Sequence, residues 1–157
     1  MIEPVILKNI MNYDLLLEFA FAHTDNKMKL FCDQQEVVPI NGKGSIEKKI
    51  SLPSSLWLQI SGKNEDKDTS IKDGFIVKDR HIRLINVSLN GIRPPTNFIR
   101  RWPLLHVGGR GRNQKIYSHY WGFNGEIELE FCGKDILTWL LETNRFRDDN
   151  WHKDNYL

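Results

Sequence analysis

The segment NGEIELEF, residues 124–131, decides the fold class of this 157-residue chain. Its apolar side chains Ile127, Leu129 and Phe131 alternate with three glutamates, and this period of two places them on one face of a β-strand. An Asn-Gly pair opens the segment and indicates a tight turn. The segment is therefore predicted to be a strand with one buried face and one face exposed to water.

The same period of two recurs along the chain. The runs that show it are YDLLLEFAFAH (13–23), KMKLFC (27–32), SIEKKISL (45–52) and SLWLQIS (55–61). HIRLINVSL, residues 81–89, is apolar on both faces, which is typical of a central strand. Further Asn-Gly pairs at 41–42 and 90–91 separate these runs as turns.

Only one segment is predicted to be a helix, near residues 135–142. Asp135 follows Gly133 as a candidate N-cap, and Ile136 and Trp139 share one side of the helix. Many short strands followed by one late helix favour an all-β fold. We predict a single domain over 1–157, an antiparallel β-sandwich of jelly-roll type with one short C-terminal helix packed on its edge.

The composition is that of an ordinary globular domain, with 40% hydrophobic and 27% charged residues. The formal net charge of +2 is too small to predict binding to nucleic acid or to a membrane. The two cysteines, Cys32 and Cys132, are too few for a disulfide framework, and each ends an apolar run where a buried thiol is expected. Because no signal-peptide pattern is found, we expect the protein to be made and kept in a cytoplasm-like compartment, or to leave it by cell lysis.

Motifs that would identify an enzyme are missing from the sequence. The histidines are scattered, and neither a His-Glu-x-x-His run nor a Gly-x-Ser-x-Gly elbow occurs. Asp73 and Asp79 remain open as an acid and base pair, since a glycosidase needs only two suitably spaced carboxylates. Such pairs occur on nearly every protein surface, so we predict a non-enzymatic protein.

A basic segment lies between Asp79 and Glu126, where the sequence contains no acidic residue. Residues 92–115 lose the strand pattern and contain three prolines and three glycines, which predicts an extended loop or arm. The alternative is that its arginines pair with carboxylates of the acidic flanks. We predict protein contacts rather than specific nucleic-acid contacts, because no ordered aromatic platform accompanies the arginines. The residues expected to make them are Arg93, Arg100, Arg101, Arg110 and Arg112. Residues 143–157 are predicted to be a C-terminal tail.

A short acidic stretch precedes the strand at 81–89. Hard cations such as calcium bind six to eight oxygens from carboxylates, amides and carbonyls in flexible loops. The predicted ligands of a divalent cation are Asn64, Asp68, Asp73 and Asp79. Two alternatives remain open, namely a solvated loop and neutralisation of the carboxylates by the basic neighbours Arg80 and Lys72.

The aromatic segment IYSHYWGFNG, residues 116–125, is the candidate for binding a sugar. Pyranose C–H faces pack on aromatic rings, while hydroxyl groups need polar partners. The predicted glycan-binding residues are Tyr117, His119, Tyr120 and Trp121. The alternative is that Trp121 and Phe123 belong to the core. Trp57 and Trp139 lie in apolar patterns and are predicted to be core residues.

Residues 79–91, DRHIRLINVSLNG, resemble a strand of the calcium-dependent xylan-binding carbohydrate-binding modules. That family carries an Asp-Arg-Asn start, alternating apolar residues and an Asn-Gly end, and here His81 replaces the asparagine. The resemblance spans residues 13–92 and implies a β-sandwich in which Asp79 belongs to a calcium site. Together with the segment 117–131, the pattern also resembles small β-sandwich proteins of tailed bacteriophages.

These resemblances imply two functions. The first is a structural, decoration or tail component of a phage-type virion, located in the particle and contacting other protein subunits. The second is a calcium-dependent glycan-binding module that recognises the host surface. Neither implies an enzyme, a specific nucleic-acid ligand or a membrane.

Overall fold

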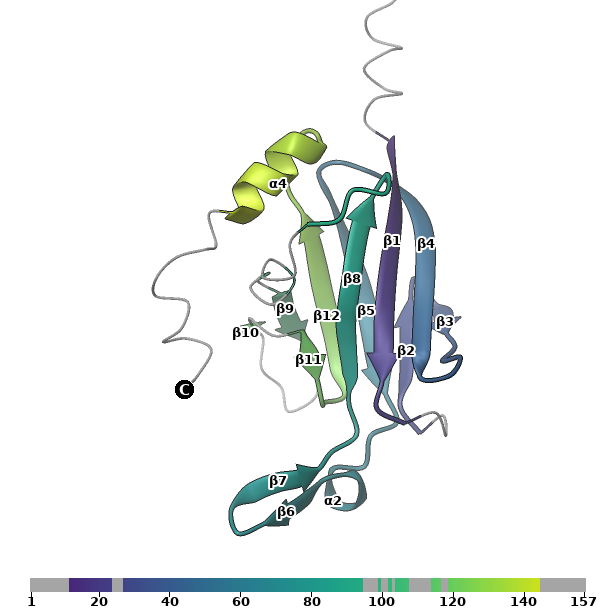
Figure 1. Cartoon of the computed structure of the whole chain (residues 1–157), viewed down its shortest axis with the longest axis vertical. Helices are drawn as coiled ribbons and strands as arrows, with labels where there is room; N and C mark the ends of the chain where they lie inside the picture. Colours follow the sequence, from purple (N-terminus) through teal and green to yellow (C-terminus); the bar gives the residue numbers. More distant parts are fainter. Residues whose placement is uncertain are drawn as a thin grey trace, which may run out of the picture.

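The computed structural model describes residues 12–23, 27–94, 99, 102, 104–107, 114–116 and 119–144. They form two antiparallel sheets packed face to face, with a small two-stranded hairpin at one end and a helix at the other (Figure 1). This arrangement confirms the predicted all-β sandwich with one C-terminal helix.

One layer of the sandwich is a four-stranded sheet in the order β11-β8-β1-β4. Its strands are β1 (Asn12–Phe21), β4 (Lys43–Ser51), β8 (Ile82–Leu89) and β11 (Tyr120–Trp121). Leu17 at the centre of β1 lies opposite Ile46 of β4 and Val87 of β8. All three are buried, because alternation turns them toward the other sheet.

The other layer is a six-stranded sheet in the order β10-β9-β12-β5-β2-β3. Its strands are β2 (Lys29–Cys32), β3 (Gln35–Val37), β5 (Ser54–Ser61), β9 (Leu104–Val107), β10 (Gln114–Ile116) and β12 (Gly125–Phe131). In β12 the predicted alternation is confirmed, since Ile127 and Leu129 are fully buried opposite Leu58 and Leu56 of β5.

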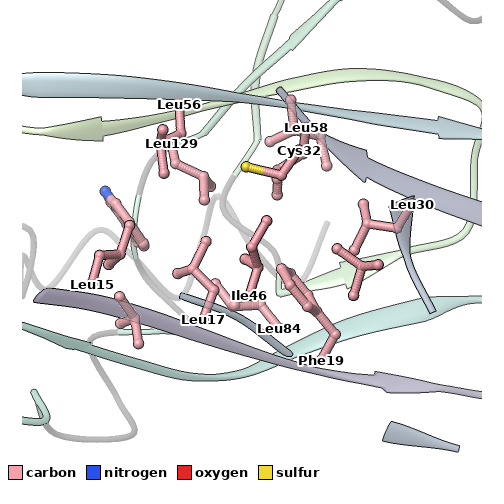
Figure 2. Packing of buried hydrophobic residues seen from close by; sticks show 14 of the residues in the cluster. Leu15, Leu17, Phe19, Leu30, Cys32, Ile46, Leu56, Leu58, Leu84 and Leu129 are labelled. Atoms are coloured by element: carbon pink, nitrogen blue, oxygen red, sulfur yellow. The ribbon is translucent and has the colours of Figure 1, made fainter. Parts of the chain in front are cut away.

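The core lies between the two sheets. Figure 2 shows Leu15, Leu17 and Phe19 of β1 pointing toward Leu58 and Leu129 of the opposite sheet. Each of these side chains is at most 1% exposed. Full burial of one such side chain contributes about 1.5–3 kcal/mol to stability, so this interface is the main source of folding free energy.

The two thiols lie in different surroundings. Cys32 is buried, and burial raises the pKa of its thiol. Cys132 is exposed, so the expectation of a buried thiol is wrong for this residue. It directly follows the last residue of β12, where the sheet ends and the chain turns toward the helix.

The predicted C-terminal helix is confirmed as α4 (Ile136–Asn144), which lies at one end of the sandwich (Figure 1). The backbone N–H of Thr138 donates to Asp135 at 2.7 Å, which makes Asp135 the N-cap and lowers the pKa of its carboxyl. Trp139 is fully buried and packs against Phe131 with 5.7 Å between ring centroids, which confirms its predicted place in the core. Within the described part of the chain, no helix is long and apolar enough to span a membrane.

Two segments differ from their predictions. Part of the predicted arm at 92–115 is strand, because β9 pairs with β12 and β10 pairs with β9. The last two residues of α4 fall in the predicted tail at 143–157. The remaining residues of both segments after Pro94 lie mostly outside the described ranges.

The acidic stretch is also more regular than predicted. It contains the short helix α2 (Glu65–Asp68) and a hairpin of β6 (Ser70–Lys72) and β7 (Phe75–Lys78). Asp73 and Gly74 form the hairpin turn with positive φ angles of 53° and 81°. This Asp-Gly pair is a standard hairpin signal that the sequence analysis did not use.

Candidate functional site

Asp79 lies at the end of the sandwich from which the β6–β7 hairpin extends. Its carboxylate accepts a hydrogen bond of 2.5 Å from Nζ of Lys63, and the same ammonium donates to the carbonyl oxygen of Gly122 at 2.6 Å. The side chains of Lys63 and Asp79 are only 4% and 10% exposed. The two charges therefore form a buried ion pair that water screens little.

Two neutral groups complete the surroundings of this carboxylate. The Tyr120 hydroxyl donates to Asp79 at 2.6 Å, and the Thr69 hydroxyl donates at 2.9 Å. Burial raises the pKa of Asp79, but the hydrogen bonds from Lys63, Tyr120 and Thr69 outweigh burial and hold this pKa below its usual value. Burial and the bond to Asp79 raise the pKa of Tyr120, so its hydroxyl keeps the proton that it donates.

The side chain of Asn124 fixes the backbone position of Lys63. The side-chain amide of Asn124 accepts from the Lys63 N–H at 2.9 Å and donates to the Lys63 carbonyl oxygen at 2.8 Å. A Cβ atom at Gly122 would lie 2.9 Å from Asp79 and 3.3 Å from the Lys63 ammonium, so only glycine fits there without a shift. The loop between β11 and β12 thus holds the ammonium in place.

Asp68, a second predicted ligand, has partners of its own. One oxygen accepts from the backbone N–H of Asn64 at 2.7 Å, and the other lies 3.1 Å from Nε of Arg80. The Asn64 bond is the main reason that the pKa of Asp68 is lowered, and Arg80 adds to it. Asp73 lies apart from both, in the exposed turn of the β6–β7 hairpin.

These contacts do not fit the predicted calcium site. Among the described residues, no group of three or more His, Cys, Asp or Glu side chains lies close enough to hold a metal ion. Arg80 already neutralises Asp68. Lys63, rather than Lys72, neutralises Asp79. The structure therefore favours the alternative in which basic side chains balance the carboxylates.

The predicted glycan-binding residues lie in different surroundings. Trp121 is fully buried and packs against Phe19 at a centroid distance of 6.1 Å, so its assignment to a binding surface is wrong. The alternation of β11 explains this, because it turns Trp121 into the core and Tyr120 outward. His119 is partly exposed, and Tyr117 lies outside the described residues.

Tyr120 remains accessible at the end of the sandwich. It is 37% exposed and stacks on His81 with ring centroids 4.2 Å apart. Burial lowers the pKa of His81 below its usual value, so the stacked imidazole is neutral near pH 7. The pair offers a small aromatic surface next to the buried Asp79.

Of the five arginines predicted to contact proteins, the structure describes one. Arg93 is exposed and donates to the carbonyl oxygen of Ile85 at 3.3 Å. The other four, Arg100, Arg101, Arg110 and Arg112, lie outside the described residues.

A surface that the sequence analysis missed lies on the outer face of the six-stranded sheet. Trp57 of β5, which was predicted to be a core residue, is 40% exposed. Leu56 and Leu58 on either side of it point into the core, so alternation turns Trp57 outward. The signal was present in the sequence, since Trp57 shares the period-two register of the polar residues Ser55 and Gln59.

Polar side chains surround this tryptophan. Glu128 of β12 lies directly opposite Trp57, and Glu126 lies opposite Gln59. Phe31 of β2 lies opposite Gln59 from the other side. A shallow hollow of about 240 Å³ opens there, and its lining includes Trp57, Phe31, Gln59, Gln34, Asp33 and Glu126. We refer to this surface as the Trp57 face.

The Trp57 face carries negative charge. Burial and the neighbouring carboxylate of Glu130 raise the pKa of Glu128. Asp33 forms an ion pair with Lys48. A second hollow of about 460 Å³ is lined by residues of β5 and β12, among them Ser55, Glu128 and Glu130. An exposed indole ring among amide and carboxylate groups provides the two kinds of contact that a sugar ring requires.

The fold and this surface define a β-sandwich with a polar, aromatic sheet face. No family model matches the chain, and no curated protein matches it. Two solved structures of the calcium-dependent carbohydrate-binding module vCBM60 are similar in fold. The selenomethionine form is 12% identical, with a TM-score of 0.42 over 75% of this chain and 90% of that one. The complex with galactobiose is 13% identical, with a TM-score of 0.38 over 74% of this chain and 97% of that one.

Proposed function

We propose that this chain is a non-catalytic glycan-binding module and that the glycan lies on the Trp57 face. The observation that carries the proposal is the 40% exposure of a tryptophan ring in the middle of a sheet face. A tryptophan side chain is highly buried on average in folded domains, so an exposed ring in the middle of a sheet face is a candidate contact surface. Here the ring is surrounded by hydrogen-bonding side chains, which favours a sugar over a purely apolar ligand.

Each element of the Trp57 face has a separate role in the proposal. The indole of Trp57 packs against the C–H face of one sugar ring. The amides of Gln59 and Gln34 and the carboxylate of Glu126 accept hydrogen bonds from hydroxyl groups, and the amides also donate. Because the two hollows follow β5 and β12, the ligand is an oligosaccharide longer than one ring.

We propose further that binding needs no calcium. Lys63 and Arg80 already balance Asp79 and Asp68, so the end of the sandwich is neutralised by the chain itself. The Trp57 face is formed by strands whose positions are fixed by the sheet.

A glycan array and calorimetry with the best ligand test this function. Trp57→Ala should weaken binding by about 2 kcal/mol, or roughly 30-fold, as is common for a tryptophan at the centre of a binding surface. Phe75→Ala is the matched control, because Phe75 is an exposed aromatic residue on the hairpin, outside the Trp57 face, and its loss should leave glycan binding unchanged. A chelator should leave binding intact. Loss of binding in Tyr120→Ala but not in Trp57→Ala would contradict the proposed site, and no glycan binding at all would contradict the function.

The biological setting is a separate part of the proposal. We propose that the module is a component of a phage-type virion and contacts other subunits there, which the resemblance of residues 79–91 and 117–131 to phage sandwich proteins supports. Mass spectrometry of purified particles should detect the chain at a fixed ratio to the major structural proteins. Its absence from particles of the producing phage would contradict this setting.

A further inference from the structure

The β6–β7 hairpin forms a two-stranded sheet of its own, separate from both layers of the sandwich. Figure 1 shows it extending from the end of the molecule opposite helix α4. All seven strand residues are exposed, three in β6 and four in β7. An isolated two-stranded sheet is marginally stable in water, so this hairpin gains from any additional strand.

The exposed side chains of the hairpin are mostly apolar. The exposed fractions are 67% for Ile71, 74% for Phe75, 63% for Ile76 and 60% for Val77. Ile71 and Ile76 face each other across the two strands. Four adjacent large apolar side chains on one protruding element are typical of a surface that another molecule covers.

β7 is the strand that can accept a partner. β6 pairs with one of its edges, and among the described residues no strand pairs with the other. A free, apolar edge is a template for pairing with another strand. In an antiparallel pair centred on Ile76, Phe75 lies opposite Val77 of a second copy, and Ile76 lies opposite its own counterpart. Every directly opposed pair in this central register is apolar.

The charges at the ends of β7 agree with the same register. Lys78 lies opposite Gly74 of the second copy and is adjacent there to Asp73, so opposite charges approach at both ends of the pair. The same register places Asp79 opposite Asp73 of the second copy, but Asp79 lies beyond the strand and is already neutralised by Lys63. No pair of like, unbalanced charges is therefore brought together.

We propose that β7 pairs antiparallel with β7 of a second copy of this chain, forming a four-stranded sheet about a twofold axis at Ile76. Twofold dimers are the commonest symmetric assemblies, and their interfaces are self-complementary in this way. Two four-residue strands bury less surface than a standard interface of roughly 1,200–2,000 Å², so the dimer is weak, with a dissociation constant of roughly 100 μM. The Trp57 face is not involved, so this inference stands or falls independently of glycan binding.

Analytical ultracentrifugation of the full chain tests the inference, over concentrations from roughly 10 μM to roughly 1 mM. Ile76→Lys places two lysines directly opposite each other and should raise the dissociation constant at least tenfold, since like charges in that position destabilise a strand pair. Ile71→Lys is the matched control. It adds the same charge at a similarly exposed position of the same hairpin but on β6, and should dimerise almost as the wild type does.

A mixing experiment tests the register. The Ile76→Lys and Ile76→Glu variants should each be monomeric, and an equimolar mixture should form heterodimers because lysine then faces glutamate. Ile71 and Ile76 are both on the surface, so circular dichroism should show an unchanged fold in every variant. A wild type that stays monomeric at the highest concentration overturns the inference. So does an equal effect of Ile71→Lys and Ile76→Lys, or a mixture that remains monomeric.

Discussion

Lys63→Met removes one charge from the interior of the protein while keeping a side chain of similar length. Asp79 would then keep a buried carboxylate with only the hydroxyl groups of Tyr120 and Thr69 as donors. The carbonyl oxygen of Gly122 would also lose its donor. Because the Asp79 side chain is 10% exposed, water cannot replace the ammonium fully.

The size of the effect follows from this burial. Removing one partner of a buried ion pair costs about 3–5 kcal/mol. The two remaining hydrogen bonds to Asp79 place the expected loss near the lower end, about 3 kcal/mol. A domain of this size loses roughly 2–4 °C of Tm per kcal/mol, so the expected decrease is roughly 6–12 °C.

Thermal unfolding followed by circular dichroism measures this loss. Lys49→Met is the matched control, because the Lys49–Asp14 pair is 3.1 Å apart but 83% and 72% exposed, and its loss should leave Tm nearly unchanged. Adding Asp79→Asn to Lys63→Met should recover part of the lost stability, since no unpaired buried charge then remains. Equal effects of Lys63→Met and Lys49→Met would refute the assignment of Lys63 as the buried cation.

Calcium supplies the second test of the same pair. An ion bound only by the folded protein at one hundred times its dissociation constant adds about 2.7 kcal/mol to stability. Because Lys63 already supplies the positive charge at Asp79, the Tm of the wild type should be the same in millimolar calcium and in chelator. A clear rise in Tm with calcium would show that the ion binds and that the fit deduced from the contacts is wrong.

Three further predictions concern stability and reactivity. The pKa values of Asp68 and Asp79 lie below the ordinary value of 3.8 in the folded state, so their contribution to stability is complete above about pH 4 and is lost as pH falls through the folded values. Denaturant titrations from pH 7 to pH 2 should show this decline, and constant stability below pH 4 would contradict it. Trp139→Ala should lower the free energy of unfolding by about 3–5 kcal/mol in chemical denaturation, because the ring is fully buried beneath α4. A loss below about 1 kcal/mol would mean that this ring does not close the end of the core. A thiol reagent should label Cys132 in the native protein and Cys32 only after unfolding, and equal rates would contradict the two different environments.

The sequence predicts the strands better than the surfaces that they form. In β12 the alternation of Leu129 and Phe131 with glutamates reports burial directly, because side chains of a strand alternate strictly between its faces. The same rule turns Trp57 toward solvent, whereas its apolar character led to the prediction that it is a core residue. Hydrophobicity is a weaker guide than register for a single large aromatic residue in a strand.

The partners of the charged residues could not be predicted from the sequence pattern. Lys63 meets Asp79 across 16 positions and the Gly122 carbonyl across 59, and only the folded chain brings these groups together. Arg80 was predicted to help neutralise the acidic cluster, and it does so by pairing with Asp68. Local spacing therefore predicted the kind of interaction and one of its basic residues, Arg80, but it could not predict Lys63.

The position of β12 in the six-stranded sheet has a consequence for synthesis on the ribosome. Among the described strands it is the last in sequence, yet it lies between β9 and β5 in the middle of the sheet. The nascent chain grows from β5 to β12 at roughly 5–20 residues per second. During these several seconds β5 has one edge unpaired, because its partner β12 has not yet been synthesised. Folding of the sandwich is thus completed only after β12 has been synthesised, and a chain that stops before Gly125 exposes an unpaired strand edge to chaperones and to other nascent chains.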